Sequence, residues 1–144
     1  MTYEETLHYL YTSIPVFQHS GASAYKPGLG TSIALDDYLG NPHKAYKTIH
    51  VAGTNGKGSV SHLLAAILRQ SGFKVGLYTS PHLVDFRERI RVNGKKISQD
   101  YVVDFVERHR SFFEPLHPSF FELTSSMAFE YFRAQQVDYA VIEV

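Results

Sequence analysis

The sequence has no cysteine, no excess of either charge and no long hydrophobic run, and each absence excludes a class of protein. Without cysteine, the 144-residue chain has neither disulfides nor cysteine-ligated metal sites. Its 14 basic residues balance its 14 acidic ones, so it lacks the basic excess of a nucleic-acid-binding surface, and any anion site must be local. No apolar run approaches the roughly 20 residues that span a bilayer. The first residues, MTYEETLHYLY, carry no basic segment followed by an apolar one, so no secretory signal is predicted.

These exclusions leave a globular protein of the cytoplasm, with no membrane or nucleic-acid partner, as the expectation. Hydrophobic residues make up 44% of the chain and charged residues 19%, as in ordinary folded domains. The length is enough for one domain with a core of its own. No internal repeat or low-complexity segment interrupts it.

Hydrophobic periodicity and turn residues predict helices that alternate with strands. Helices are expected at about 2–11, 31–40, 57–71 and 119–135, with a further helix that opens near Ser98. Strands are expected at 47–52, 74–78 and 137–144, and the first and last of these are expected to be buried. Thr2-x-x-Glu5 and Ser119-x-x-Glu122 are capping boxes, and Asn93-Gly94 supplies the type I′ turn of a β-hairpin over 88–98. We therefore predict an α/β fold: a parallel sheet flanked by helices, plus a hairpin. The chain stops at the last strand, where sites in such sheets form, so we expect it to be part of a longer protein.

The stretch HVAGTNGKGSV, residues 50–60, is placed as a phosphate-binding loop, because it follows a strand and opens a helix. Its sequence departs from the standard motif G-x-x-x-x-G-K-[ST]. Val51 occupies the position of the first glycine, and the hydroxyl-bearing residue, Ser59, lies one position after the place that the motif gives it. Glycines allow the backbone N–H groups to approach phosphate, and the helix N-terminus adds partial positive charge. Lys57 can reach the β- and γ-phosphates. The alternative is a tight turn with a solvated lysine.

Two oxygen-bearing side chains follow other strands at the same edge of the predicted sheet. Ser80 comes just beyond the strand at 74–78, and Glu143 ends the apolar strand AVIEV. With Ser59 they can converge on one Mg²⁺, which takes oxygen ligands and keeps several waters. The alternatives are a Ser-Pro turn and a solvent-facing carboxylate.

With these residues placed, four segments together resemble the amino-terminal part of the folylpolyglutamate synthase/dihydrofolate synthase family, within the Mur ligase superfamily. They are HVAGTNGKGSV, GLYTSPHLVDFRERIRVNGKKIS, FFELTSSMAFEYF and DYAVIEV, in the family's order. The likeness runs from about Tyr25 to Val144, and the unusual loop spelling matches the family's G-T-N-G-K-G-S. The resemblance implies that residues 1–144 are the amino-terminal part of a P-loop ATP-binding domain, in a ligase that joins glutamate to a folate or pteroate carboxylate. It further implies ATP, Mg²⁺ and an acyl-phosphate intermediate.

Carried over residue by residue, the resemblance assigns roles in the site. It implies that Asn55, Gly56, Lys57 and Gly58 bind ATP phosphates, with Ser59 assisting, that Lys57 is catalytic, and that Ser80 and Glu143 hold Mg²⁺. It implies two pterin-contacting loops, Tyr25, Lys26 and Pro27 in one and Ser119, Phe120, Phe121 and Glu122 in the other. The alternatives for the second loop are structural: Glu122 belongs to a capping box, and the Phe pair can be core.

Other charged and histidine residues are given plain interpretations. The run Arg87, Glu88, Arg89 and Arg91 is interpreted as a solvated strand face. His50 and His82 are interpreted as packing or surface groups, because no zinc spacing is present.

The family's histidine magnesium ligand, its lysine near the γ-phosphate and its carboxy-terminal domain lie beyond this sequence. We therefore expect no ligase activity from residues 1–144 alone. For the parent enzyme, the resemblance implies a monomer with small-molecule substrates. The alternatives are a muramyl-peptide ligase, a nucleotide-binding regulatory module, and an α/β domain that binds no nucleotide.

Overall fold

A computed structural model describes residues 1–13, 28–53 and 55–143 of the chain. The chain divides into two compact units. One comprises Met1–Asn41 with Gln99–Met127, and the other Pro42–Ser98 with Ala128–Val144. The predicted loop at 50–60 and the predicted magnesium ligands all belong to the second unit.

The first unit is helical. Its elements are α1 (Tyr3–Ser13), α3 (Gly30–Tyr38), α5 (Gln99–Phe113), the 3-10 turn η4 (Glu114–Leu116) and the first half of α6 (Phe120–Ala134). The capping box that opens α1 is confirmed: the Glu5 amide donates to Thr2 Oγ1 at 3.1 Å, and the Thr2 amide donates to Glu5 Oε1 at 3.2 Å. Val102, Phe105 and Val106 are buried, because these apolar residues repeat on one face of α5.

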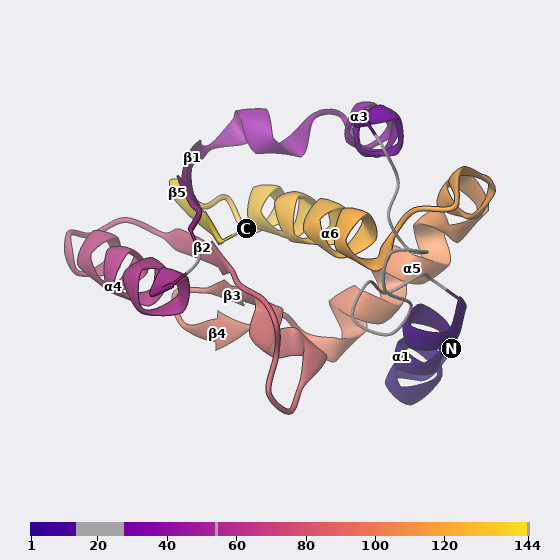
Figure 1. Cartoon of the computed structure of the whole chain (residues 1–144), viewed down its shortest axis with the longest axis horizontal. Helices are drawn as coiled ribbons and strands as arrows, with labels where there is room; N and C mark the ends of the chain where they lie inside the picture. Colours follow the sequence, from indigo (N-terminus) through magenta and orange to yellow (C-terminus); the bar gives the residue numbers. More distant parts are fainter. Residues whose placement is uncertain (14–27, 54, 144) are drawn as a thin grey trace. The chain divides into compact units, whose positions relative to one another are not determined.

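The second unit is built on a five-stranded sheet among the described residues (Figure 1). Its strands are β1 (Lys47–Val51), β2 (Val75–Tyr78), β3 (Ile90–Val92), β4 (Lys95–Lys96) and β5 (Tyr139–Glu143), in the order β1-β5-β2-β3-β4. The first three in this order run parallel, and β3 and β4 join antiparallel. The sheet is therefore mixed, because the predicted hairpin forms its far side. Asn93 and Gly94 have φ of 48° and 81°, as its tight turn requires.

Helices cover both faces of the central strands. On one face, Leu64, Ala65 and Leu68 of α4 (Lys57–Gln70) pack against buried residues of β1, β2 and β5. On the other face, the ring of Phe132 lies so close to Gly76 that a Cβ there would stand 2.6 Å from it. β5 is paired on both sides, and its last four residues are buried, as its nearly continuous apolar run predicted.

One burial prediction for this unit is wrong. β1 was expected to be buried, but Lys47, Thr48 and His50 are exposed and only Val51 is buried. The reason is its place at the edge of the sheet, where it pairs with β5 alone among the described strands.

The apolar face of α4 is only partly buried. Val60, Leu63 and Ile67 remain 48%, 62% and 51% exposed. The apolar stripe is wider than the strip of sheet that Leu64 and Leu68 contact.

No helix in the described parts of the chain combines the length and the apolar character needed to cross a membrane.

Candidate functional site

The loop after β1 turns directly into α4 through glycines with unusual backbone angles. Gly53 has φ of 149°, and Gly56, the residue before the helix, is left-handed with φ 73° and ψ 7°. Among the described residues no side chain caps the N-terminus of α4, and the first turn of the helix holds no acidic residue. The partial positive charge and the N–H groups of this helix end are therefore not neutralised by the helix's own side chains. Such an end binds anions.

The predicted phosphate-binding residues line this turn. Asn55, Gly56, Gly58 and Ser59 are exposed, and Lys57, the first residue of α4, is half-buried. Gly58 needs no left-handed angle. The loop thus offers an accessible backbone surface with one lysine at its centre.

Glu143 lies beside this loop. It ends β5 in register with Val51, the last residue of β1, and its Oε2 would be 3.9 Å from a Cβ on Gly58. The residue is only 5% exposed. No hydrogen bond or ion pair engages its side chain among the residues that the structure describes. A buried carboxylate without a protein partner is costly unless a cation joins it.

Ser80 reaches the same edge of the sheet from β2. The last residue of β2, Tyr78, is in register with Ile142 of β5, and half-buried Ser80 follows two residues later. The peptide bond between Ser80 and Pro81 is cis. Because β1, β5 and β2 are parallel, their carboxyl ends bring the loop, Glu143 and Ser80 to one edge, as the sequence predicted.

No group of three or more His, Cys, Asp or Glu that could hold a metal occurs within the described ranges. Ser80 and Glu143 would supply only two oxygen ligands. That number suits Mg²⁺, which usually retains several waters and shares phosphate oxygens.

The segment after Ser80 is more ordered than the sequence interpretation allowed. The run Arg87 to Arg91 is not a solvated strand face, because η3 (Phe86–Arg89) precedes β3 and Arg89 is 6% exposed. Arg89 Nε donates to His82 Nδ1 at 2.7 Å. Burial, and next the positive charge of Arg89, lower the pKa of His82, consistent with a neutral ring accepting this hydrogen bond. His82 is thus a packing group and the exposed His50 is a surface group, as the sequence indicated.

The sequence did carry a signal for this turn. Asp85 and Glu88 have the spacing of a capping box, and both of its hydrogen bonds are present.

The second predicted substrate loop belongs to the helical unit and opens α6. The Ser119 amide donates to Glu122 Oε1 at 2.8 Å, and the Glu122 amide donates to Ser119 Oγ at 3.1 Å, which confirms this capping box. Phe120 is 4% exposed and stacks on Tyr11 with ring centroids 5.4 Å apart, so it is core. Phe121 is 48% exposed. Tyr25, Lys26 and Pro27 lie outside the described residues.

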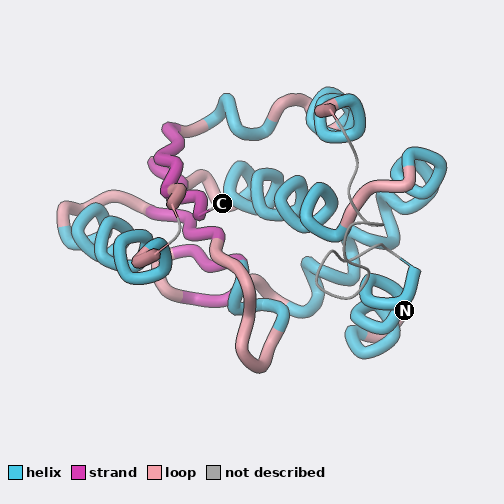
Figure 2. The backbone as a smooth tube through the Cα atoms, in the orientation of Figure 1, coloured by secondary structure: helices cyan, strands magenta, loops and turns pink. Residues whose placement is uncertain are grey.

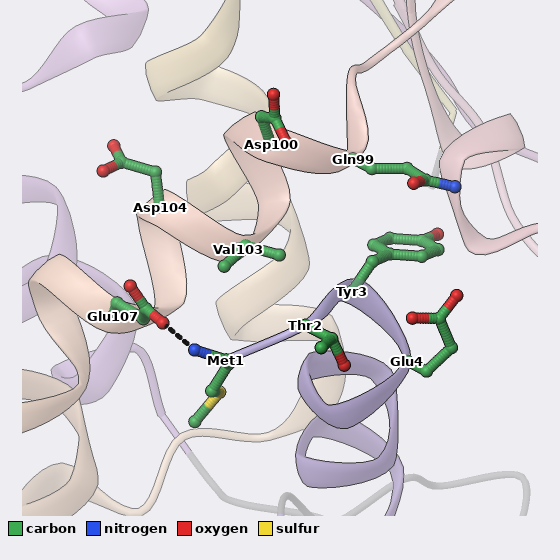
Figure 3. Close-up of a pocket in the computed structure, with 9 residues that line it drawn as sticks. All are labelled: Met1, Thr2, Tyr3, Glu4, Gln99, Asp100, Val103, Asp104 and Glu107. Carbon is green, nitrogen blue, oxygen red and sulfur yellow. Dashed lines mark hydrogen bonds and ion pairs between the residues drawn. The ribbon is translucent and has the colours of Figure 1, made fainter.

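A hollow of about 290 Å³ also occurs in the helical unit, between the first residues of α1 and α5 (Figure 3). Four of its nine lining residues are acidic, and the Met1 ammonium pairs with one of them, Glu107. None of the predicted site residues lines it.

Comparison with known proteins gives consistent relatives, although no family model matches the chain. It is 40% identical over its whole length to 17% of a Haloferax volcanii protein named "Probable bifunctional folylpolyglutamate synthase/dihydropteroate synthase". It is 39% identical over 82% of its length to 29% of the dihydrofolate synthase/folylpolyglutamate synthase of Bacillus subtilis.

Solved structures agree with the sequence relatives. The folylpolyglutamate synthase of Thermotoga maritima matches 99% of the chain with a TM-score of 0.86 and 46% identity, over 32% of that protein. A complex described as FPGS with AMPPCP and folate matches the whole chain with a TM-score of 0.84 and 36% identity, over 35% of its length. The chain therefore spans about a third or less of these relatives.

Proposed function

Because the chain belongs to the folylpolyglutamate synthase/dihydrofolate synthase family, we propose that the protein containing it is an ATP-dependent ligase that joins glutamate to the carboxylate of a folate or dihydropteroate. The observation that carries this proposal is the N-terminus of α4, which no described side chain caps, with the buried carboxylate of Glu143 beside it. A phosphate chain and its divalent cation would occupy such a place together.

In this proposal the loop binds the phosphates of ATP. Backbone groups of Asn55, Gly56 and Gly58 approach the phosphate oxygens, and Ser59 adds a hydroxyl at the exposed start of α4. Lys57 is the catalytic residue, because its ammonium neutralises charge as the phosphoryl group is transferred.

The residues present fit Mg²⁺ as the companion of ATP. Glu143 would hold it through its carboxylate, which has no partner among the described residues, and Ser80 would hold it through its hydroxyl. The cation supplies charge neutralisation on the phosphates when bound.

The acceptor is proposed to lie against the loop at the start of α6. Phe121 offers an exposed ring for stacking, and Glu122 offers a carboxylate for hydrogen bonding to a pterin. Ser119 and Phe120 hold these two in place through the capping box and the core. Tyr25, Lys26 and Pro27 are proposed as the second contact.

The proposed reaction has two steps. A carboxylate oxygen of the acceptor attacks the γ-phosphorus of ATP, and the bond from this phosphorus to the β-phosphate oxygen breaks. The products of this step are an acyl phosphate and ADP. The glutamate amine then attacks the acyl carbon, loses a proton, and inorganic phosphate leaves with the formation of an amide. The chain's contribution is to position the groups and stabilise charge.

The wider assignments are part of the same proposal. Residues 1–144 form the amino-terminal part of the ATP-binding domain, and the complete protein acts as a monomer in the cytoplasm on small molecules.

The test is a ligation assay with the complete protein, Mg-ATP and labelled glutamate, using dihydropteroate or tetrahydrofolate as acceptor. Label is expected in a folate product, and Lys57→Ala is expected to lower the rate by about 100-fold or more, as when a charge-stabilising group is removed. Lys44→Ala, which removes an exposed lysine before β1, is the matched control and should leave the rate unchanged.

Other outcomes would overturn the proposal. ATP binding without a product from either acceptor contradicts it, and activity with a UDP-muramyl peptide would replace it with the muramyl-peptide ligase. Effector-stimulated ATP hydrolysis without glutamate would point to a regulatory module. Absence of nucleotide binding would leave only an α/β domain.

A further inference from the structure

The segment that carries Ser80 is a loop closed at its base. Tyr78 of β2 pairs with Ile90 of β3, and the Thr79 amide donates to the Arg89 carbonyl at 3.0 Å. The chain between these points leaves the sheet and returns to it (Figure 2). The position of Ser80 therefore depends on what orders this loop.

One carboxylate binds three successive amides of the loop. Glu88 Oε1 accepts from the Leu83 amide at 2.9 Å, and Oε2 accepts from the amides of Val84 and Asp85 at 3.3 and 3.0 Å. These hydrogen bonds chiefly hold the pKa of Glu88 below its ordinary value. The carboxylate thus joins the tip of the loop to η3 at its base.

Burial does not order the tip of the loop, which is Leu83 and Val84, because both of these apolar side chains are exposed to solvent. Leu83 is 91% exposed and Val84 is 89% exposed. Almost no apolar area is removed from water there, so the hydrophobic contribution to ordering is close to nil. Within the described parts of the chain, the hydrogen bonds to Glu88 are the polar contacts that hold the amides of Leu83 and Val84.

A second tie lies nearer to Ser80. Arg89 is nearly buried, and its Nε donates to the Nδ1 of His82, two residues after Ser80. The His82 ring also lies edge-on to the buried ring of Phe86, with centroids 6.2 Å apart. Both ends of the tripeptide Ser80-Pro81-His82 are therefore tied to the β2–β3 base.

We propose that Glu88 and Arg89 are positioning residues that hold Ser80 at the end of β2 for its contact with the nucleotide-bound cation. This inference rests on the proposed function, in which Ser80 is a magnesium ligand. Neither residue touches the reacting groups. Glu88 acts through the amides at 83–85, and Arg89 acts through His82.

The test uses Glu88→Gln in the complete protein, because this change keeps the shape of a half-buried side chain. A carboxylate accepts at both oxygens, whereas the amide must turn its NH₂ toward one of the N–H donors. Hydrogen exchange at 83–85 is expected to accelerate by at least about tenfold, because hydrogen bonds to a charged acceptor are lost. The gain in AMPPCP affinity on adding Mg²⁺ should shrink by a similar factor, with metal-free affinity unchanged.

Arg89→Lys keeps the charge, removes the Nε donor and should reduce the same gain. Glu5→Gln is the matched control, because Glu5 also accepts a backbone amide in a capping box. It should change neither measurement.

Unchanged exchange at 83–85 would overturn the inference, and so would faster exchange with an intact Mg²⁺ gain. Ser80→Ala separates this failure from that of the proposed function. If Ser80→Ala abolishes the gain and Glu88→Gln does not, the positioning role alone is wrong. If Ser80→Ala has no effect, the cation role of Ser80 fails too, and the ligation assay decides whether the ligase assignment stands.

Discussion

Glu143 and Gly58 meet where β5 ends and α4 begins: a Cβ on Gly58 would stand 3.9 Å from Glu143 Oε2. That distance is ordinary van der Waals contact, so the backbone tolerates a methyl group there. The space beside the carboxylate is nevertheless where a phosphate oxygen and its cation are proposed to lie. Folding and binding therefore make opposite demands at residue 58.

Gly58→Ala is expected to raise stability and weaken nucleotide binding. Alanine is favoured over glycine in a helix by up to about 1 kcal/mol, and less in the first turn. The methyl group would crowd the phosphate, so affinity for Mg-AMPPCP should fall. Thermal unfolding and calorimetric titration measure the two effects.

Gly56→Ala is the companion variant, because Gly56 has φ of 73°. A side chain at this left-handed angle costs roughly 1–2 kcal/mol, so stability should fall. Equal changes in unfolding free energy for Gly56→Ala and Gly58→Ala would show that the left-handed angle of Gly56 does not set the two positions apart.

Glu143→Gln is expected to leave the metal-free protein as stable as before, or more so. The native carboxylate is buried, and no described group neutralises it. The same change should cut the Mg²⁺-dependent gain in AMPPCP affinity by about tenfold or more, the scale seen when groups around a metal are altered. A large loss of stability without divalent cations would indicate a structural partner instead. Unfolding with and without Mg²⁺ distinguishes the cases.

Gly76→Ala is expected to destabilise the sheet unit through overpacking. The new Cβ would stand 2.6–2.8 Å from three ring atoms of Phe132. Such overpacking typically costs about 1–3 kcal/mol. The double variant with Phe132→Leu should lose less stability than the sum of the losses of the two single variants, because the clash is removed. Strict additivity in denaturant unfolding would show that the ring moves aside freely.

Acid should weaken the loop that Glu88 orders. The pKa of Glu88 lies below its ordinary value of 4.5, first because the Leu83 amide donates to it and next because the Asp85 amide does. A lowered pKa in the folded state means that this stabilisation is present above pH 4.5 and is lost as the pH falls through the folded-state pKa. Denaturant unfolding across the acid range should show wild type and Glu88→Gln converging at low pH. A constant difference would contradict this.

Much of the fold was predictable because its signals are local. The capping boxes at Thr2 and Ser119, the Asn93-Gly94 turn and the apolar spacing of α5 each specify backbone angles or a helical face within a few residues. The hairpin's place in the sheet was not predictable in this way, because strand pairing joins distant segments.

The same difference between local signals and tertiary contacts applies to the candidate site. The loop at 50–60 and the strand ends were found from the sequence, and their roles in binding stay predictions. The burial of Arg89, the hydrogen bonds of Glu88, and the contrast between buried Phe120 and exposed Phe121 were not found.

The sequence by itself determined the family, the glycine-rich turn from β1 into α4, and most helix and strand positions, because short-range sterics and periodicity decide these. Tertiary structure alone decided that β1 lies at an edge, that Glu143 stands beside Gly58, and that Arg89 is buried. Burial and partners depend on which distant segments pack together, and no local pattern contains that information.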